Sequence, residues 1–61
     1  MDFKTMLKAQ FENQPELFEI EELEDGTLYV WHKVDKISTY FKFDEKNNLK
    51  DMYWQTAQVM I

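Results

Sequence analysis

The sequence predicts an α+β domain in which one amphipathic helix packs on an antiparallel sheet. Apolar residues near the start recur at helical spacing, and later segments alternate apolar and polar residues between turn-forming residues. We expect an N-terminal amphipathic helix packed on a three- to four-stranded antiparallel meander, with a short C-terminal strand or helix. At 61 residues the chain should form a single small domain over residues 1–61.

The helix is predicted over residues 3–12. Its apolar stripe consists of Phe3, Met6, Leu7 and Phe11. Asp2 precedes the stripe and is a favourable N-cap, while Pro15 disfavours helical backbone at Gln14. A stripe of this kind needs an apolar surface to pack on, and the following segments can supply one.

Three strands are predicted over residues 18–21, 27–34 and 37–43, where apolar and polar residues alternate. Asp25-Gly26 indicates a hairpin turn between the first two, because glycine readily adopts a positive φ. A three-residue loop over 24–26 pairs Ile20 with Val30 and Phe18 with His32. A two-residue turn at Asp35-Lys36 pairs Val34 with Ile37, His32 with Thr39, Val30 with Phe41 and Leu28 with Phe43. Both registers place apolar residues on one face of the sheet.

The segment from Leu49 onward fits two structures. As a strand to about residue 55, it would place Met52 beside Phe41, Trp54 beside Thr39, and Asp51 opposite Lys42. As a helix, its apolar residues would recur at 3.6-residue spacing with Asn48 as the cap. We favour the strand, which gives a four-stranded meander followed by a short tail.

Composition argues against several classes of function. The net charge is −5, and the chain contains neither Arg nor Cys. Because Arg supplies the bidentate contacts to phosphates and base edges, direct nucleic-acid binding is not expected. Apolar runs are too short for a membrane span, and the lack of cysteine suits a soluble, cytoplasmic protein.

Neither catalysis nor metal binding is predicted. A zinc site needs three or four converging ligands, and the chain has one His and no Cys. In the expected register His32 and Ser38 lie on opposite faces, so they cannot act as base and nucleophile. We therefore expect no catalytic residues, no metal and no cofactor. His32 is interpreted as a core-face residue hydrogen-bonded to Thr39, with a pH-switch or ligand role as the alternative.

Candidate interaction residues lie on the sheet face opposite the helix. Tyr29, Trp31 and Tyr40 share this face, and Tyr53 joins them if the fourth strand forms. We call these four residues the aromatic face. Because Tyr and Trp are enriched at interface centres, the face is predicted to bind a protein partner or a second copy in a homodimer. Alternatively, the rings decorate a half-exposed sheet, or residues 57–61 fold over them.

Glutamates give a second hypothesis. Glu19 and Glu21 share one strand face, and Glu22 lies on the other. Such residues commonly protect a strand edge and aid solubility. Alternatively, they could imitate nucleic acid. The chain would then be an acidic inhibitor, of the kind that phages encode, that occupies the nucleic-acid-binding surface of another protein. The leading expectation is a non-enzymatic protein-interaction module.

Overall fold

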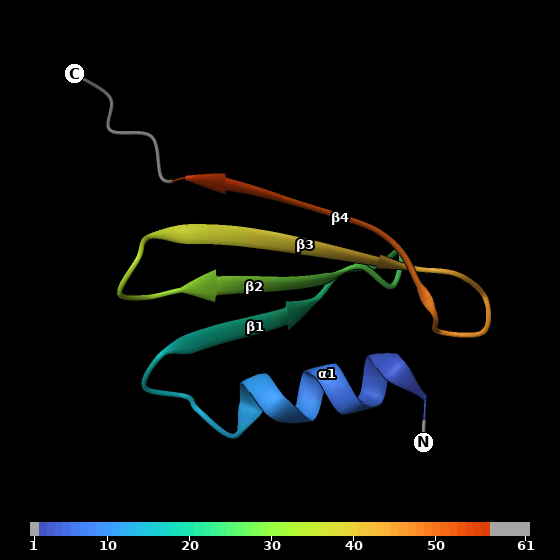
Figure 1. Ribbon diagram of the computed structural model, residues 1–61, viewed down its shortest axis with the longest axis horizontal. Helices are drawn as coiled ribbons and strands as arrows, with labels where there is room; N and C mark the ends of the chain where they lie inside the picture. The colour runs from blue at the N-terminus through green and yellow to red at the C-terminus, as the bar shows by residue number, and fades with distance from the viewer. Residues whose placement is uncertain (1, 57–61) are drawn as a thin grey trace.

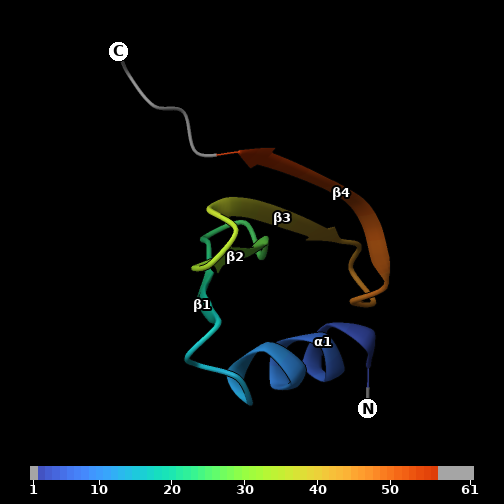
Figure 2. The same ribbon diagram turned by 60° about the vertical axis from the view of Figure 1, so that its left-hand side comes forward.

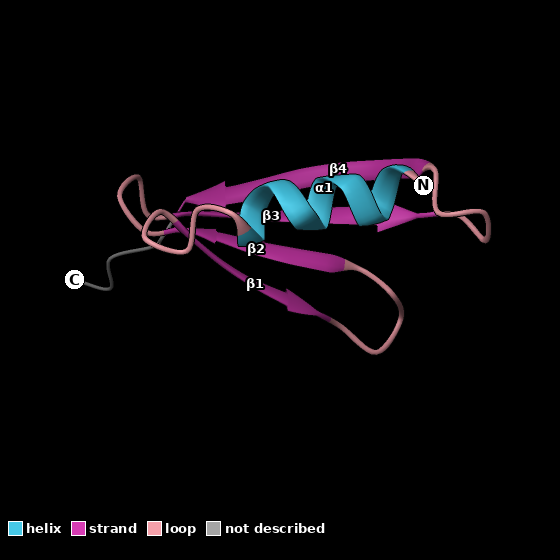
Figure 3. Ribbon diagram, turned by 90° about the horizontal axis from the view of Figure 1, so that it is seen from below, coloured by secondary structure: helices cyan, strands magenta, loops and turns pink. Residues whose placement is uncertain are grey.

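The computed structural model describes residues 2–56, which form one helix and a four-stranded antiparallel sheet. The elements are α1 (Phe3–Glu12), β1 (Phe18–Glu22), β2 (Leu28–His32), β3 (Ile37–Phe43) and β4 (Leu49–Thr56). The strands follow one another in the sheet in chain order, so the sheet is the predicted meander (Figure 1). The helix lies on one side of this sheet (Figures 2 and 3).

Helix α1 begins and ends where the sequence predicts. The Oδ1 atom of Asp2 accepts a hydrogen bond of 2.8 Å from the backbone N–H of Thr5, as an N-cap should. At the other end, the N–H of Asn13 donates to the carbonyl of Ala9. The helix is too short to be stable alone in water, so its packing on the sheet must contribute to its stability.

A small apolar core lies between α1 and the sheet. Leu28 and Val30 are fully buried and Phe41 nearly so. Helix residues Leu7 and Phe11 pack against these three. The Phe11 ring lies 5.0 Å from that of Phe18 and 5.8 Å from that of Phe41, centroid to centroid. A further set of half-buried side chains completes the cluster: Phe18, Ile20 and Phe43.

Two of the three strand registers agree with the prediction. Strand β1 pairs Ile20 with Val30 and Phe18 with His32. Strand β4 forms over Leu49–Thr56, which confirms the favoured strand over the helix for that segment. It places Met52 opposite Phe41, Trp54 opposite Thr39 and Asp51 opposite Lys42. Residues 57–61, to which we gave a possible covering role, lie outside the described residues.

The predicted register between β2 and β3 is wrong by two residues. His32 pairs with Ile37, Val30 with Thr39 and Leu28 with Phe41. Strand β2 therefore ends at His32, and Val34 lies in the loop with 72% of its surface exposed. The loop is closed by a hydrogen bond from the N–H of Lys36 to the carbonyl of His32, with Lys36 at a φ of 58°. A shift of two residues preserves the faces, so the apolar face survives the change.

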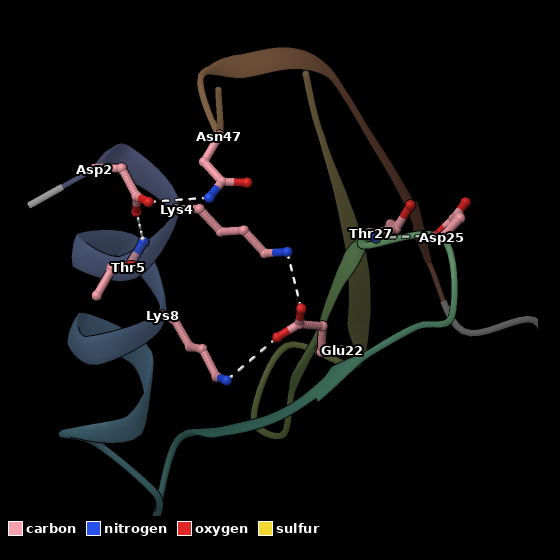
Figure 4. A network of polar contacts seen from close by, with 8 residues as sticks. All are labelled: Asp2, Lys4, Thr5, Lys8, Glu22, Asp25, Thr27 and Asn47. Carbon is pink, nitrogen blue, oxygen red and sulfur yellow. Dashed lines mark hydrogen bonds and ion pairs between the residues drawn. The ribbon is translucent and has the colours of Figure 1, made fainter. Parts of the chain in front are cut away.

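The helix is tied to the sheet at two further places, both visible in Figure 4. The Nζ atoms of Lys4 and Lys8 lie 2.9 and 3.3 Å from the carboxylate of Glu22 on β1. The side-chain amide of Asn47, in the β3–β4 loop, donates a 3.0 Å hydrogen bond to Asp2. These contacts join α1 to β1, and the N-cap of α1 to the β3–β4 loop. No helix within residues 2–56 has the length and apolar character needed to span a membrane.

Candidate interaction surface

The aromatic face lies on the side of the sheet away from α1. Directly paired residues share a face, and Tyr29 pairs with Tyr40, which pairs with Tyr53. Trp31 lies two residues along β2 from Tyr29 and therefore on the same face. The core residues Leu28 and Val30 alternate with them and point to the opposite side, toward the helix.

The three tyrosines form a row across β2, β3 and β4. The ring centroids of Tyr40 and Tyr53 are 4.9 Å apart with an interplanar angle of 12°, which is a stacked arrangement. The rings of Tyr29 and Tyr40 are 5.2 Å apart and tilted by 53°. Aromatic pairs at these separations contribute beyond their buried area. The row is therefore preformed, and its rings lose little freedom when a partner binds.

A hydrogen bond fixes one end of the row. The hydroxyl of Tyr29 lies 3.1 Å from the hydroxyl oxygen of Ser38 on the neighbouring strand. Tyr29, Trp31 and Tyr40 are half-buried, while Tyr53 is 41% exposed. Because α1 covers the other face, none of the helices and strands formed by residues 2–56 lies over these rings. Within residues 2–56 the face is thus ordered, and its rings are partly exposed.

The acidic residues predicted as interaction sites separate into two groups. Glu19 and Glu21 are exposed and pair with Trp31 and Tyr29, so they border the aromatic face at the β1 edge. Glu22 lies on the helix side, where it binds Lys4 and Lys8. Hydrogen bonding, chiefly by Lys4 and then by Lys8, holds the pKa of the Glu22 carboxyl below its usual value. Glu22 therefore acts in the structure as a contact between β1 and α1.

That pairing of Glu22 was not visible from the sequence. The alternation placed Glu22 on the core side, but not beside Lys4 and Lys8. Those two lysines lie four residues apart on one face of α1, so they can reach the same carboxylate. This spacing is the signal that could have indicated a shared acidic partner.

His32 occupies the position that we predicted for it. Its Nε2 atom lies 3.0 Å from the hydroxyl oxygen of Thr39. The ring also contacts Phe18 edge-on, at 5.2 Å between centroids, and lies 6.5 Å from Phe11. The contact to Thr39 is diagonal, because the observed register pairs His32 with Ile37. His32 is thus a half-buried member of the core, hydrogen-bonded across the strands.

Two surface hollows differ in the chemistry of their lining. The larger, of about 350 Å³, lies at the end of α1 and is lined by Gln10, Phe11, Asn13, Gln14 and Phe18. These side chains are amides and phenyl rings, which offer no general acid, base or nucleophile. The smaller, of about 170 Å³, lies by the β1–β2 turn and is lined by Asp25, Thr27, Lys42, Phe43 and Lys50.

Asp25 in the smaller hollow has a structural role in the turn. Its Oδ1 atom accepts a 2.9 Å hydrogen bond from the backbone N–H of Thr27. That bond is the main cause of the lowered pKa of Asp25, and Lys42 adds an electrostatic contribution. Over residues 2–56, no three His, Cys, Asp or Glu side chains come together as a metal-binding group.

Comparison with protein-family models, with curated proteins and with solved structures finds no match to this chain. The functional interpretation therefore depends on the geometry of the surfaces.

Proposed function

We propose that this chain is a non-enzymatic protein-interaction module that self-associates through its aromatic face. The observation that carries the proposal is the row of Tyr29, Tyr40 and Tyr53, in which Tyr53 stacks on Tyr40, on the sheet face opposite α1. Trp31 adds a fourth large ring on the same side. Tyr and Trp provide much contact area at a low entropic cost, which is why they are common binding hot spots.

Self-association is the favoured form because a small domain gains stability from an oligomeric partner. A chain of this length buries only about 60% of its unfolded surface, and this one has no cysteine for disulfides. Packing two aromatic faces together would remove apolar ring surface from water. Each Å² of apolar surface buried in this way contributes a favourable free energy of about 25 cal/mol. A cytoplasmic location is part of the proposal, and its support is the cysteine-free composition.

The acidic-inhibitor hypothesis has less support. Such an inhibitor would present several carboxylates together to a basic target. Glu22 is instead bound to Lys4 and Lys8 on the helix side, which leaves Glu19 and Glu21 at the β1 edge. We therefore propose the inhibitor role only as the alternative to self-association.

Replacement of Trp31 tests the proposal. Because Trp31 lies outside the core cluster, Trp31→Ala should leave the circular dichroism spectrum largely unchanged while weakening self-association at least tenfold in Kd. Val34→Ala is the matched control, since Val34 is 72% exposed in the β2–β3 loop and off the aromatic face. Equal dissociation constants for the wild type and Trp31→Ala would contradict the proposal. Unfolding of Trp31→Ala would show that Trp31 belongs to the core.

Salt separates the two functional alternatives. Two copies that each carry a charge of −5 repel one another, so added salt should leave self-association unchanged or strengthen it. Binding of an acidic inhibitor to a basic target should weaken steeply as salt rises. Charge reversal at Glu19 and Glu21 would abolish the second kind of binding and leave the first intact.

A further inference from the structure

Strand β4 differs from the other edge of the sheet in how it is protected. Both β1 and β4 are edge strands, because the strand order is β1-β2-β3-β4. An edge strand presents unpaired backbone N–H and C=O groups, which proteins commonly guard with charges, prolines or bulges. Three of the five residues of β1 are glutamates, and one of them also contacts α1. The β1 edge is therefore protected by charge against pairing with a strand of another chain.

The second half of β4 lacks such protection. Every residue of β4 is exposed, and its charged residues, Lys50 and Asp51, lie near its start. The register irregularity at Lys42/Phe43 lies at that same end. Residues 52–56 carry no charge, no proline and no glycine, and the sequence has no charged side chain after Asp51. This stretch can therefore pair with another strand without burying a charge.

The helix-side face of β4 is also uncovered. Met52 and Trp54 point to the side of the sheet that α1 occupies, because they pair with Phe41 and Thr39. They are nevertheless 51% and 61% exposed. Figure 2 shows β4 at the opposite edge of the sheet from β1, with its start near the beginning of α1 and its later part away from the helix. An open backbone edge and two exposed large apolar side chains thus occur along the same stretch of β4. One backbone group in it has a local partner, because the N–H of Met52 donates a 2.8 Å hydrogen bond to Asp51 Oδ1 and would have to exchange it on pairing.

We infer that β4 pairs with β4 of a second copy, antiparallel and about a two-fold axis, to form one eight-stranded sheet. An axis perpendicular to the sheet keeps each face on its own side. Directly opposite residues must share a face, so a residue can lie opposite its own copy or opposite one an even number of positions away. The possible centres are therefore single residues of β4.

Side-chain chemistry favours Tyr53 over Asp51 as the centre. In that register Tyr53 lies opposite its copy, and Met52 lies opposite Trp54 of the other chain, twice over. Asp51 then lies opposite Gln55, and Lys50 opposite Thr56, so no like charges meet. Centring on Asp51 would instead place two carboxylates in direct opposition. The Tyr53 register also joins the two tyrosine rows into one row of six rings.

The edge pairing uses the backbone edge of β4, whereas the proposed function uses the outer surface of the rings, and Tyr53 belongs to both. The two proposals are tested separately. Edge pairing leaves both aromatic faces open on the same side of the extended sheet. A paired dimer therefore presents twice the width of aromatic surface to any partner. Pairing through strand edges is a common mode of protein association, in which backbone hydrogen bonds provide affinity and side chains provide register.

Single cysteines test the pairing directly, because the chain has none of its own. In the Tyr53 register the two Cα atoms of residue 53 lie about 4.5 to 5.5 Å apart, within the range that a disulfide requires. Tyr53→Cys should therefore give a covalent dimer under mild oxidation. Gln55→Cys is the matched control on the same strand and face. Its two copies would be about 13 Å apart and should not link.

The outcomes separate this inference from the proposed function. Stacked sheets lie about 10 Å apart, too far for a disulfide, so association through the aromatic face alone would not link Tyr53→Cys. Linking of Tyr53→Cys but not Gln55→Cys supports the edge pairing. Linking of neither variant, of both equally, or of Gln55→Cys alone would overturn it. Each of these results is independent of whether Trp31→Ala weakens association.

A charge exchange gives a second measurement that does not depend on oxidation. Met52→Lys with Trp54→Lys places lysine opposite lysine twice in the Tyr53 register and should abolish pairing. Met52→Lys with Trp54→Glu places lysine opposite glutamate and should restore it relative to the first pair of changes. Both side chains are exposed in the monomer, so both double variants should fold. Equal association by the two double variants would overturn the register.

Discussion

Asp2 links two parts of the chain that are far apart in sequence. It caps α1 through Thr5 and accepts a hydrogen bond from Asn47 in the β3–β4 loop (Figure 4). Hydrogen bonding by Thr5, with a further contribution from Asn47, lowers the pKa of Asp2 from 3.8 to about 2. The charged form of Asp2 is thus favoured by folding, which makes the start of the helix sensitive to acid.

The lowered pKa predicts a loss of stability in acid. A carboxyl whose pKa is lower in the folded state stabilises the fold above its unfolded pKa, and that stabilisation disappears as the pH falls through its folded pKa. For Asp2 this loss occurs over the pH range between its usual pKa of 3.8 and its folded-state pKa of about 2. Glu22 and Asp25 have shifts in the same direction.

Asp2→Asn isolates the contribution of this charge, because asparagine is also a good N-cap. The free energy of unfolding of the variant should fall less steeply than that of the wild type between about pH 4 and pH 2. Urea unfolding at several pH values in this window measures the slopes. Parallel slopes for the two proteins would show that Asp2 does not contribute to the acid sensitivity.

Backbone conformation makes a second prediction at the residue scale. Gly26 has a φ of 87°, and among residues 2–56 a Cβ there would approach only the Nζ of Lys4, at 3.6 Å. Gly26→Ala should therefore destabilise by about 1 to 2 kcal/mol through backbone strain rather than through a clash. Lys36 is the opposite case, because it is a non-glycine residue with a φ of 58°. Lys36→Gly should therefore stabilise the fold by about 0.5 to 1 kcal/mol. Thermal unfolding of both variants measures the two changes in stability. The explanation would be refuted if both variants were stabilised or both were destabilised.

At the scale of elements, the attachment of α1 depends mainly on Phe11. Its ring contacts Phe18 and Phe41 on two different strands. Phe11→Ala should cost about 2 to 3 kcal/mol, below the range for a fully buried Phe because Phe11 is only half-buried. Met6→Ala is the control on the same helix, and since Met6 is 47% exposed it should cost less than about 1 kcal/mol. Urea unfolding followed by circular dichroism gives both values.

The two variants of the helix also show whether the packing is assigned correctly. If Met6→Ala cost as much as Phe11→Ala, the side of α1 that bears Met6 would be covered by something other than the described sheet. That result would place a contact on the exposed flank of the helix.

Most element positions were predictable from the sequence because they depend on local signals, although β2 ends at His32 and not at Val34. Asp2 and Pro15 bound the helix, Gly26 marks a turn, and alternation assigns each strand residue to a face. The β2–β3 register was not predictable in the same way, because alternation repeats every two residues and cannot detect a shift of two. The loop decided it instead, through Lys36 in the left-handed region and its bond to His32.

The candidate surface was predictable to the same extent. The face shared by Tyr29, Trp31 and Tyr40 follows from alternation, which a two-residue shift preserves. The stacking of Tyr53 on Tyr40 required the fourth strand, for which the sequence allowed a helix. The binding of Glu22 by α1 required the lateral position of the helix over the sheet, which no local pattern specifies.

At the scale of the whole molecule, the two sides of the sheet have different roles. The helix side holds the core of Leu28, Val30 and Phe41, and the opposite side holds an ordered row of tyrosines that no other element of residues 2–56 covers. One helix covers one face of a sheet, so a domain this small leaves the other face for solvent or a partner. The proposed self-association would complete a second apolar layer.

The mass of the protein in solution tests this central proposal most directly. Sedimentation equilibrium at two protein concentrations would compare the wild type, Trp31→Ala and Val34→Ala. We predict a wild-type mass above that of the 7.5 kDa monomer, the same mass for Val34→Ala, and a lower mass for Trp31→Ala at equal concentration. A wild type that is monomeric at both concentrations, or a Trp31→Ala variant with the wild-type mass, would contradict self-association through the aromatic face.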